Sequence, residues 1–299
     1  MSVRELLLFC GVFLTSCLAE NLRPPYLNLA REKHITVSAT STCGEFIDAK
    51  NANKIKYKKE LYCKLTGSSP YEKDYKDSNL IYGQYCDYCD PSIPDKKHIV
   101  NYTIDGTDRW WQSPPLSRGL EYQKVNITID LGQEYHIAYI YIRMANSPRP
   151  AVWSLERSTD YGKTFSTWYY FASDVECRTI FGVLPSRNRS FVRDDEVVCE
   201  TKYASRIPLE GGEMVVSLIN DRPNIKNFSY SDTLQQWTRA TNVRLRLLRP
   251  TTLHSHSIIH DSHDKSVTRR YFYSIRDIGI GGHCQCNGSR ILFCFFLNE

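Results

Sequence analysis

Acidic residues, histidines and cysteines are the side chains of this sequence that could do chemistry, and their spacing limits what that chemistry could be. Acid pairs occur at Glu210 and Glu213 and in the run "RDDE" at 193–196. Two carboxyl groups at a suitable separation could hydrolyse a glycosidic bond. Acidic residues in turns are common, however, and the sequence contains neither a G-x-S-x-G nor an HExxH motif. The chain is therefore predicted not to be an enzyme.

A histidine-rich segment, "HSHSIIHDSHDK" at 254–265, contains the residue types that bind zinc. Four histidines stand beside two aspartates: His254, His256, His260, His263, Asp261 and Asp264. The segment is polar and lies between two predicted strands, so it is interpreted as a surface loop that would position metal ligands poorly. We predict no metal site here and no cofactor.

The first residues have the pattern of a secretory signal peptide. Arg4 precedes an apolar run over 6–18, and small residues follow at Cys17 and Ala19, the −3 and −1 positions of a cleavage before Glu20. The run is too short to cross a bilayer, and no later stretch is long enough. Residues 1–19 are therefore predicted to be removed from a secreted protein with no transmembrane segment. Secretion argues against a nucleic-acid partner.

Composition supports an extracellular surface. Asn-x-Ser/Thr glycosylation sequons occur at Asn101, Asn126, Asn188, Asn227 and Asn287. The net charge is only +5, with basic and acidic residues mixed. The basic run "NKIKYKKE" at 53–60 could contact sulfated glycans or anionic lipid heads. The alternative, a solvated loop, stays open.

Removal of the signal peptide leaves 11 − 2 = 9 cysteines, an odd number, in a compartment where most should pair. "CDYC" at 86–89 lacks the second pair that a thiolate zinc site needs. A bond within it would close a small, strained ring. Nested bridges, Cys43–Cys89 and Cys63–Cys86, would close longer loops and stabilise more, roughly 2–4 kcal/mol each. The exact connectivity of these four stays open; Cys177 and Cys199 flank a polar loop and are predicted to close it.

Several stretches have the two-residue period of β-strands. In "KVNITIDLG", Val125, Ile127, Ile129 and Leu131 alternate with polar residues, which places the Asn126 sequon on the wet face. "YHIAYIYIRM" is apolar on both faces and predicts a more buried strand. Further strands are predicted in "EMVVSLIN", "NVRLRLL" and "RYFYSIRDIGI", a hairpin in "VWSLERSTDYGKTFSTWYYF", and one short helix in "YSDTLQQWTRA".

Many strands separated by Gly, Pro and Asn turns predict an all-β fold, a jelly-roll β-sandwich. Trp110 and Trp111 lead into a buried strand, so at least one should be buried. The segment 22–97 is polar and rich in Tyr and Lys, with weak strand periodicity. It is predicted to form an irregular, disulfide-stapled layer on the sandwich.

Four segments together resemble one family: "DGTDRWWQSPPLS", "LERSTDYGKTF", "PLEGGEMVVSLINDRP" and "YSIRDIGIGGHCQCNG". Their order is similar to that of laminin N-terminal (LN) domains, over roughly residues 21–288, and "PLEGGE" resembles the α-chain version. The resemblance implies a galactose-binding-like jelly roll followed by laminin EGF-like modules. It also implies a function in the extracellular matrix: association with β- and γ-chain LN domains to build the basement-membrane network, with heparan sulfate, sulfatides or integrins and cell adhesion as further possibilities.

The "PLEGGE" loop is the predicted protein-interaction site: Pro208, Leu209, Glu210, Gly211, Gly212 and Glu213. Pro208 favours an extended residue before it, and the glycines permit close backbone approach. Glu210 and Glu213 should then stand out on either side, with Leu209 as an apolar contact. An ordinary acidic turn before a strand is the alternative, which the resemblance disfavours.

The resemblance also raises the question of calcium, because related LN domains bind Ca²⁺ through three groups. These are an Asp in the loop before the Trp pair, a Thr just before that pair and a hydroxyl group in the last strand. Asp105 matches the first, but Arg109 and Arg276 stand at the other two positions. Guanidinium groups repel Ca²⁺. Either Thr107 or Asp108 substitutes or there is no site, and we predict none.

The C-terminal residues begin an EGF-like module without completing it. Such a module needs eight cysteines, whereas only Cys284, Cys286 and Cys294 are present, so at least one should be free. The predicted division is 1–19 signal peptide, 20–282 LN domain and 283–299 incomplete module, as in a truncated or alternatively processed laminin chain. It would compete with laminin polymerisation. The rival hypothesis is a carbohydrate- or sulfated-glycan-binding module.

Overall fold

The computed structural model describes residues 27–48, 51–66, 83–186, 190–252 and 264–284. The predicted signal peptide, the sequons at Asn188 and Asn287, and the four histidines of the histidine-rich segment lie outside these ranges. Cys286 and Cys294 also lie outside them. Within the described ranges, no helix is long and apolar enough to span a bilayer.

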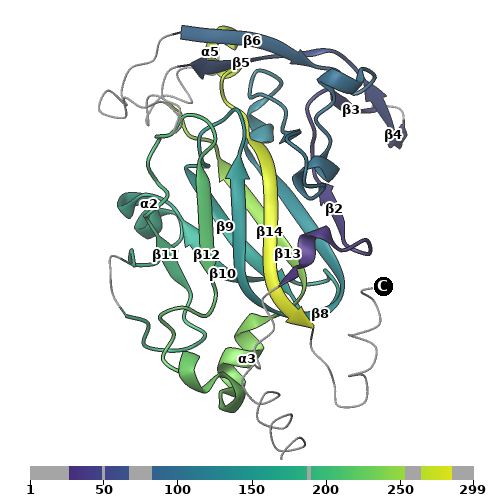
Figure 1. The fold of residues 1–299 in the computed structure, drawn as a ribbon. Coiled ribbons are helices and arrows are strands. Elements are labelled where there is room, and N and C mark those ends of the chain that lie inside the picture. Colours follow the sequence, from purple (N-terminus) through teal and green to yellow (C-terminus); the bar gives the residue numbers. More distant parts are fainter. Residues whose placement is uncertain (1–26, 49–50, 67–82, 187–189, 253–263, 285–299) are drawn as a thin grey trace, which may run out of the picture.

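Ten strands form one hydrogen-bonded network, and the long strand β8 (Val125–Met144) divides it into two layers (Figure 1). The first layer contains the N-terminal half of β8 and, around it, β2 (Thr36–Ala39), β13 (Arg239–Arg249), β9 (Val152–Ser158), β10 (Ser166–Phe171) and β11 (Val198–Glu200). The second contains the C-terminal half of β8 with β12 (Glu213–Ser217), β14 (Ser274–Cys284), β1 (Leu27–Asn28) and β7 (Trp111–Gln112). The two layers form a β-sandwich.

A corner near Gly132 lets β8 pass from one layer to the other. Gly132 has φ +69°, a left-handed conformation that suits glycine, and its N–H donates to Asp130 Oδ1 at 2.9 Å. Opposite this corner, the pairing of β13 with β8 shifts between Ala240 and Asn242. Such an irregularity bends a strand and increases its twist. The two strands predicted from "KVNITIDLG" and "YHIAYIYIRM" are therefore one continuous, bent strand.

The residues of β8 that face the core are odd-numbered in the first half of the strand and even-numbered at its end. Val125, Ile127 and Ile129 are buried in the first half, as the alternation predicted, whereas Ile140 and Ile142 are buried in the second half. A two-residue period can change parity only at an irregularity, and β14 shows one between Gly281 and Gly282. The second half was predicted to be more buried than the first, and none of the residues from Tyr135 to Met144 is exposed, although the outer tyrosines and arginine are only half-buried.

The hairpin predicted in "VWSLERSTDYGKTFSTWYYF" is confirmed as β9 and β10. Its turn contains Tyr161 (φ 58°) and Gly162 (φ 83°), and the Gly162 N–H donates to Ser158 Oγ at 2.9 Å. The predicted short helix is also confirmed, as α3 (Asp232–Thr238), which the Ser231 side chain caps. The other helical segments among the described residues are α2 (Asp174–Thr179), α5 (Lys265–Thr268), η1 (Leu29–Arg31), η3 (Pro94–Lys96), η4 (Val100–Thr103), η5 (Leu120–Gln123) and η6 (Ile225–Tyr230).

The N-terminal layer is more regular than its weak periodicity predicted. It contains two hairpins at one end of the sandwich: β3 (Glu45–Asp48) with β4 (Asn51–Tyr57), and β5 (Glu60–Thr66) with β6 (Gly83–Cys89) (Figure 1). A two-stranded hairpin has too little apolar area to be stable by itself. Disulfides and contacts with the sandwich therefore supply its stability, and the predicted fold class, an all-β sandwich with a disulfide-stapled N-terminal layer, is confirmed.

Three disulfides are present among the described residues: Cys43–Cys89, Cys63–Cys86 and Cys177–Cys199. The first two are the nested bridges that the sequence favoured. Cys63–Cys86 joins directly opposed residues of β5 and β6, and Cys43–Cys89 ties β6 to the segment before β3. The third closes the polar loop after α2 against β11.

The apolar core lies between the two layers and contains several tryptophans. Trp111 is fully buried and its Nε1 donates to Thr42 Oγ1 at 3.3 Å, so the expectation of a buried tryptophan in the Trp110–Trp111 pair is confirmed. Trp168, also fully buried, donates from Nε1 to the Trp237 carbonyl oxygen at 2.7 Å. Trp110 is half-buried and stacks on His98 with ring centroids 4.4 Å apart.

Candidate interaction site

The "PLEGGE" loop precedes β12, and it continues the backbone hydrogen bonds between β12 and β8 beyond the first residue of β12. The Gly211 N–H donates to the Ala145 carbonyl oxygen at 2.8 Å, and the Met144 N–H donates to the Gly212 carbonyl oxygen at 2.9 Å. Gly211 has φ +67°, a conformation that residues with a Cβ rarely adopt. The loop is thus a rigid extension of the second layer.

Crowding rather than backbone conformation favours glycine at position 212. A Cβ on Gly212 would lie 3.0 Å from Arg149 Nε and 3.1 Å from Arg149 Cγ. Arg149 in turn donates from Nη1 to the Ile207 carbonyl oxygen at 3.3 Å. The peptide bond between Ile207 and Pro208 is cis. Both ends of the loop therefore contact the same arginine.

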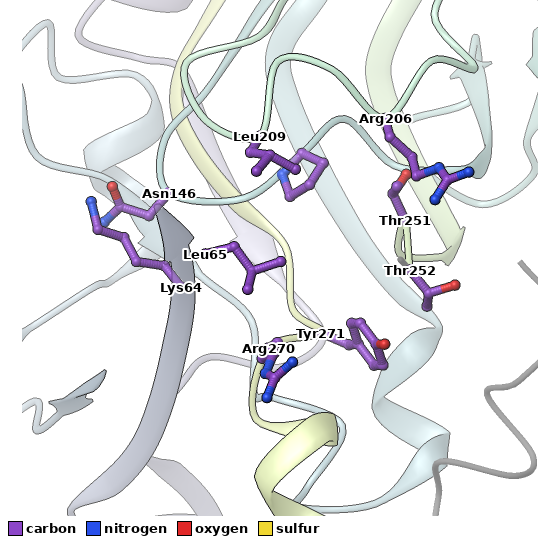
Figure 2. Close-up of a pocket in the computed structure, with 10 residues that line it drawn as sticks. Lys64, Leu65, Asn146, Arg206, Leu209, Thr251, Thr252, Arg270 and Tyr271 are labelled. Carbon is purple, nitrogen blue, oxygen red and sulfur yellow. The ribbon is translucent and has the colours of Figure 1, made fainter. Parts of the chain in front are cut away.

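Leu209 is not the exposed apolar contact that the sequence predicted. It is buried, with 7% of its surface exposed, and points into a small hollow of its own chain (Figure 2). The hollow is lined by Lys64, Leu65, Asn146, Pro148, Arg206, Leu209, Thr251, Thr252, Arg270 and Tyr271. The hydrophobic effect accounts for the difference, because an aliphatic side chain beside an available hollow is more stable inside it than in water. Leu209 holds the loop in place and is not available to a partner.

The two loop carboxylates have different environments. Glu210 forms an ion pair with Lys64 of β5, with Oε2 3.1 Å from Nζ and about a third of the Glu210 side chain exposed. This contact ties the loop to the N-terminal layer. Glu213 is 54% exposed, accepts a hydrogen bond from the Tyr141 hydroxyl at 2.9 Å, and lies 3.7 Å from Arg143 Nε. Glu213 is therefore the loop carboxylate that a partner can reach.

Glu213 lies on the outer surface of the second layer, which we call the tyrosine face. The face comprises outward side chains of β12, β8 and β14: Glu213, Val215, Tyr139, Tyr141, Arg143 and Asp277. Val215 is 55% exposed. Burial and the hydrogen bond to Glu213 raise the pKa of Tyr141 to about 12, so its hydroxyl stays protonated and donates at neutral pH.

Glycines on β14 leave room on this face for the tyrosine rings of β8. Gly279 and Gly281 lie directly opposite Tyr141 and Tyr139, and a Cβ on Gly281 would come 2.0 Å from the Tyr139 ring. The tyrosine rings therefore cover the glycines, an arrangement that stabilises glycine-containing strands. Aromatic side chains are enriched in protein–protein contacts.

The outer edge of β12 is closed to another strand. The Tyr203 hydroxyl donates to the Val215 carbonyl oxygen and accepts from the Val215 N–H, both at 2.9 Å. The Tyr169 hydroxyl donates to the Ser217 carbonyl oxygen at 3.1 Å. Since these backbone groups are satisfied within the chain, strand addition at this edge is disfavoured. A partner at this part of the second layer would therefore contact the face rather than the edge of β12.

The acid run at 193–196 has structural contacts rather than a catalytic arrangement. Arg193 and Asp195 form an exposed ion pair, with Nη2 2.7 Å from Oδ2. Asp194 is buried and accepts hydrogen bonds from Asn224 and Ser231. The sequence gave no indication that Asp194 would be a buried hydrogen-bond acceptor, because its two partners lie 30 and 37 residues further along the chain.

Asp105 already has a cationic partner. Arg109 Nη2 lies 2.8 Å from Asp105 Oδ2, and the Thr107 hydroxyl donates to Asp105 Oδ1 at 2.7 Å. Arg276 Nη1 lies 3.7 Å from Asp108 Oδ1. The residues present do not fit Ca²⁺, since guanidinium groups pair with the acids that would bind it. In the described part of the chain, no group of three or more His, Cys, Asp or Glu residues could hold a metal ion.

Three of the predicted glycosylation sites are described. Asn101 on η4 and Asn227 on η6 are exposed, and Asn126 on β8 is half-buried. At the end of β14, the Sγ of Cys284 accepts a hydrogen bond from Gln133 Nε2 at 3.5 Å.

Comparison with known proteins agrees with this architecture. The family model for the laminin N-terminal domain (domain VI) matches residues 22–282. The chain belongs to the laminin N-terminal domain family. Members of this family are non-enzymatic structural modules, so the prediction that the chain is not an enzyme is confirmed.

Several laminin subunits are similar to this LN domain. It is 51% identical to laminin subunit alpha of Drosophila melanogaster over 273 residues, which cover 91% of this chain and 7% of that protein. It is 52% identical to human laminin subunit alpha-3 over 269 residues, 90% of this chain and 8% of that protein. Identity with human laminin subunit gamma-1 is 28%, over 89% of this chain and 15% of that protein. The predicted resemblance to laminin α LN domains is confirmed, and the chain spans less than a tenth of the α subunits it matches.

Among solved structures, the family 32 carbohydrate-binding module of NanJ from C. perfringens, in complex with galactose, aligns with a TM-score of 0.38. The two are 8% identical, and the alignment covers 86% of this chain and 98% of that one.

Proposed function

We propose that this LN domain associates with the LN domains of laminin β and γ chains and thereby takes part in assembling the basement-membrane network. Membership of the laminin α group supports the proposal. The structural observation that carries it is the exposed Glu213 carboxylate at the margin of the tyrosine face. The proposal places the mature domain, 20–282, outside the cell after loss of a signal peptide at 1–19. It treats 283–299 as the start of an EGF-like module.

The loop and the face would act together. The Lys64–Glu210 pair and the buried Leu209 hold the loop rigid, so little conformational entropy is lost when a partner binds. Tyr139, Tyr141 and Val215 offer apolar and aromatic contact area. The carboxylate of Glu213 would select a partner surface that carries a basic group.

A competition assay tests this proposal. The purified domain should inhibit polymerisation of intact laminin by occupying β and γ LN domains. Glu213→Ala should raise the concentration needed for half inhibition at least about tenfold, which corresponds to about 1.4 kcal/mol. Its stability should change by no more than about 0.5 kcal/mol, because the site is exposed. Asp195→Ala, which removes another exposed carboxylate paired with an arginine, is the matched control and should inhibit like the wild type.

Leu209→Ala separates loop integrity from direct contact. Because Leu209 is buried, its truncation should lower the free energy of unfolding by about 2–5 kcal/mol. Equal inhibition by wild type and Glu213→Ala at matched stability would remove the loop from the binding site.

A separate structural observation supports a second candidate function. This function is the binding of sulfated glycans, such as heparan sulfate, or of sulfatides. Strand β4 and the two residues after it expose Lys54, Lys56, Lys58 and Lys59, the basic run seen in the sequence, and exposed Tyr57 belongs to the same run. A cluster of cations beside an aromatic ring suits a sulfated sugar. Retention on heparin that falls when these lysines are replaced by Gln, with polymerisation unaffected, would separate this function from the first. An integrin contact remains part of the same proposal for cell adhesion.

A further inference from the structure

An aromatic side chain stands almost fully exposed next to a glycosylation sequon. Tyr230, the last residue of η6, has 91% of its surface exposed. Its hydroxyl makes no hydrogen bond with any described residue, and its ring lies near no other ring of the described chain. Asn227, in the same segment, begins the sequon Asn-Phe-Ser and is also exposed. Such a ring offers an apolar face on which a ligand can stack.

Asn227 and Tyr230 line one open hollow together. Its walls are Asn224, Asn227, Tyr230, Ser231, Asp232 and Thr233, and its volume is about 600 Å³. Small-molecule sites have volumes of roughly 300–1,000 Å³. The walls other than Tyr230 are polar side chains that can donate or accept hydrogen bonds. The hollow therefore combines one aromatic platform with several polar groups.

Buried contacts hold the two sides of the hollow in place. The buried carboxylate of Asp194 accepts from the Asn224 N–H at 3.0 Å and from Asn224 Nδ2 at 2.7 Å. The same carboxylate accepts from the Ser231 hydroxyl at 2.8 Å. Gln235 Nε2 donates to the carbonyl oxygens of Phe228 and Ser229 at 3.2 and 3.0 Å. The backbone on both sides of Tyr230 is thus fixed before any ligand arrives.

We propose that this hollow binds the first N-acetylglucosamine of an N-linked glycan on Asn227, with the Tyr230 ring stacked on the apolar face of the sugar. A pyranose ring has an apolar C–H face that packs on aromatic rings, and its hydroxyl and acetamido groups require polar partners. Because sugar and tyrosine belong to one chain, the contact is intramolecular and costs little entropy of association. The inference rests on secretion but not on association with other laminin chains.

Attachment follows the chemistry of the sequon. The Asn227 side-chain nitrogen forms a bond to C1 of the sugar of a lipid-pyrophosphate-linked oligosaccharide. The C1–O bond breaks, the lipid pyrophosphate leaves with the bonding electrons, and the nitrogen loses one proton to a base. No oxidant or reductant takes part. Asn227 is accessible for this reaction, since its side chain is exposed and makes no hydrogen bond with the described residues.

The test uses protein secreted from eukaryotic cells. Glycopeptide mass spectrometry should find Asn227 occupied. Tyr230→Ala should lower Tm by about 2–4 °C in the glycosylated protein, a shift that corresponds to roughly 1 kcal/mol. In an Asn227→Gln background the same substitution should change Tm by less than about 1 °C, so the two effects are coupled. Tyr230→Phe, which keeps the ring, should behave like the wild type in both backgrounds.

A second measurement reports contact with the sugar rather than fold stability. An amidase that hydrolyses the side-chain amide of glycosylated Asn227 should release the glycan from the folded Tyr230→Ala protein several-fold faster than from wild type. Tyr161→Ala, another exposed tyrosine far from any sequon in the sequence, should leave this rate unchanged. An unoccupied Asn227, equal Tm shifts in the two backgrounds, or an unchanged release rate would each overturn the proposal.

Discussion

Glu60→Gln should destabilise the whole domain, because Glu60 and Arg118 form a buried ion pair between the N-terminal layer and the rest of the chain. Both side chains are 8% exposed. The guanidinium donates to both carboxylate oxygens, with Arg118 Nε 2.6 Å from Oε1. The carboxylate also accepts from the Gly44 N–H at 2.8 Å. The substitution keeps the volume of the side chain and removes its charge.

The expected loss follows from the charge left behind. Arg118 Nη1 also donates to the Glu45 carbonyl oxygen at 2.8 Å, and its guanidinium lies 3.9 Å from the Phe46 ring. Neither contact replaces a carboxylate. Removing one partner of a buried pair costs about 3–5 kcal/mol. In a domain of this size, 1 kcal/mol corresponds to roughly 2–4 °C, so Tm should fall by roughly 6–20 °C.

Thermal unfolding followed by circular dichroism measures this effect. Asp195→Asn, which neutralises an exposed ion pair, is the matched control and should change the free energy of unfolding by no more than about 0.5 kcal/mol. The Glu60→Gln loss should persist at high salt, since buried pairs are weakly screened. Adding Arg118→Met to Glu60→Gln should recover part of the loss, because the unpaired charge is gone. A Tm within about 1 °C of wild type for Glu60→Gln alone would refute this reasoning.

Three further predictions concern pH, packing and disulfides. Burial lowers the pKa of His98 from its ordinary 6.5 to about 4, so the unfolded chain binds more protons between these values. The contribution of His98 to the free energy of unfolding should be constant above pH 6.5 and should fall by up to roughly 3 kcal/mol as the pH drops to 4. Urea unfolding measured at several pH values checks this. A His98 imidazole that titrates near pH 6.5 in the folded protein, measured by NMR, would contradict it. Gly282→Ala should lower Tm more than Gly281→Ala. A Cβ at position 282 would lie 2.6 Å from a backbone oxygen, whereas a Cβ at position 281 would meet a tyrosine ring that can rotate away. A larger fall in Tm for Gly281→Ala would contradict this reasoning. Replacing both Cys177 and Cys199 by Ala should cost about 3 kcal/mol in chemical unfolding, and peptide mapping of unreduced protein should link these two residues and no other pair involving them.

Local patterns in the sequence predicted those parts of the fold that local physics determines. The alternation of Val125, Ile127 and Ile129 predicted their burial, because one face of a strand must meet the core. The turn at Tyr161 and Gly162 predicted the hairpin of β9 and β10. The corner in β8 was not predictable, because it depends on a shift in the pairing with β13, more than a hundred residues further along the chain.

The candidate site shows the same division. The glycines of "PLEGGE" predicted close backbone approach, which the contact of Gly212 with Arg149 explains. The burial of Leu209 and the pairing of Glu210 with Lys64 could not be predicted, since the hollow and the lysine come from segments far away in sequence. Position in the sequence alone cannot tell an exposed carboxylate from one already paired within the chain.

The arrangement of β14 determines how the domain responds to mechanical force. β14 pairs antiparallel with β8 along nearly its whole length, and β1 pairs with its last residues on the opposite side. A pull on the chain at Cys284, directed along β14, would load these hydrogen bonds together in shear rather than open them one at a time. Forced unfolding depends on the barrier to unfolding and not on equilibrium stability. Both neighbours of β14, strands β8 and β1, therefore resist a tension along it at the same time. The tyrosine face lies on β8, β12 and β14, and it would keep its shape until β14 slides.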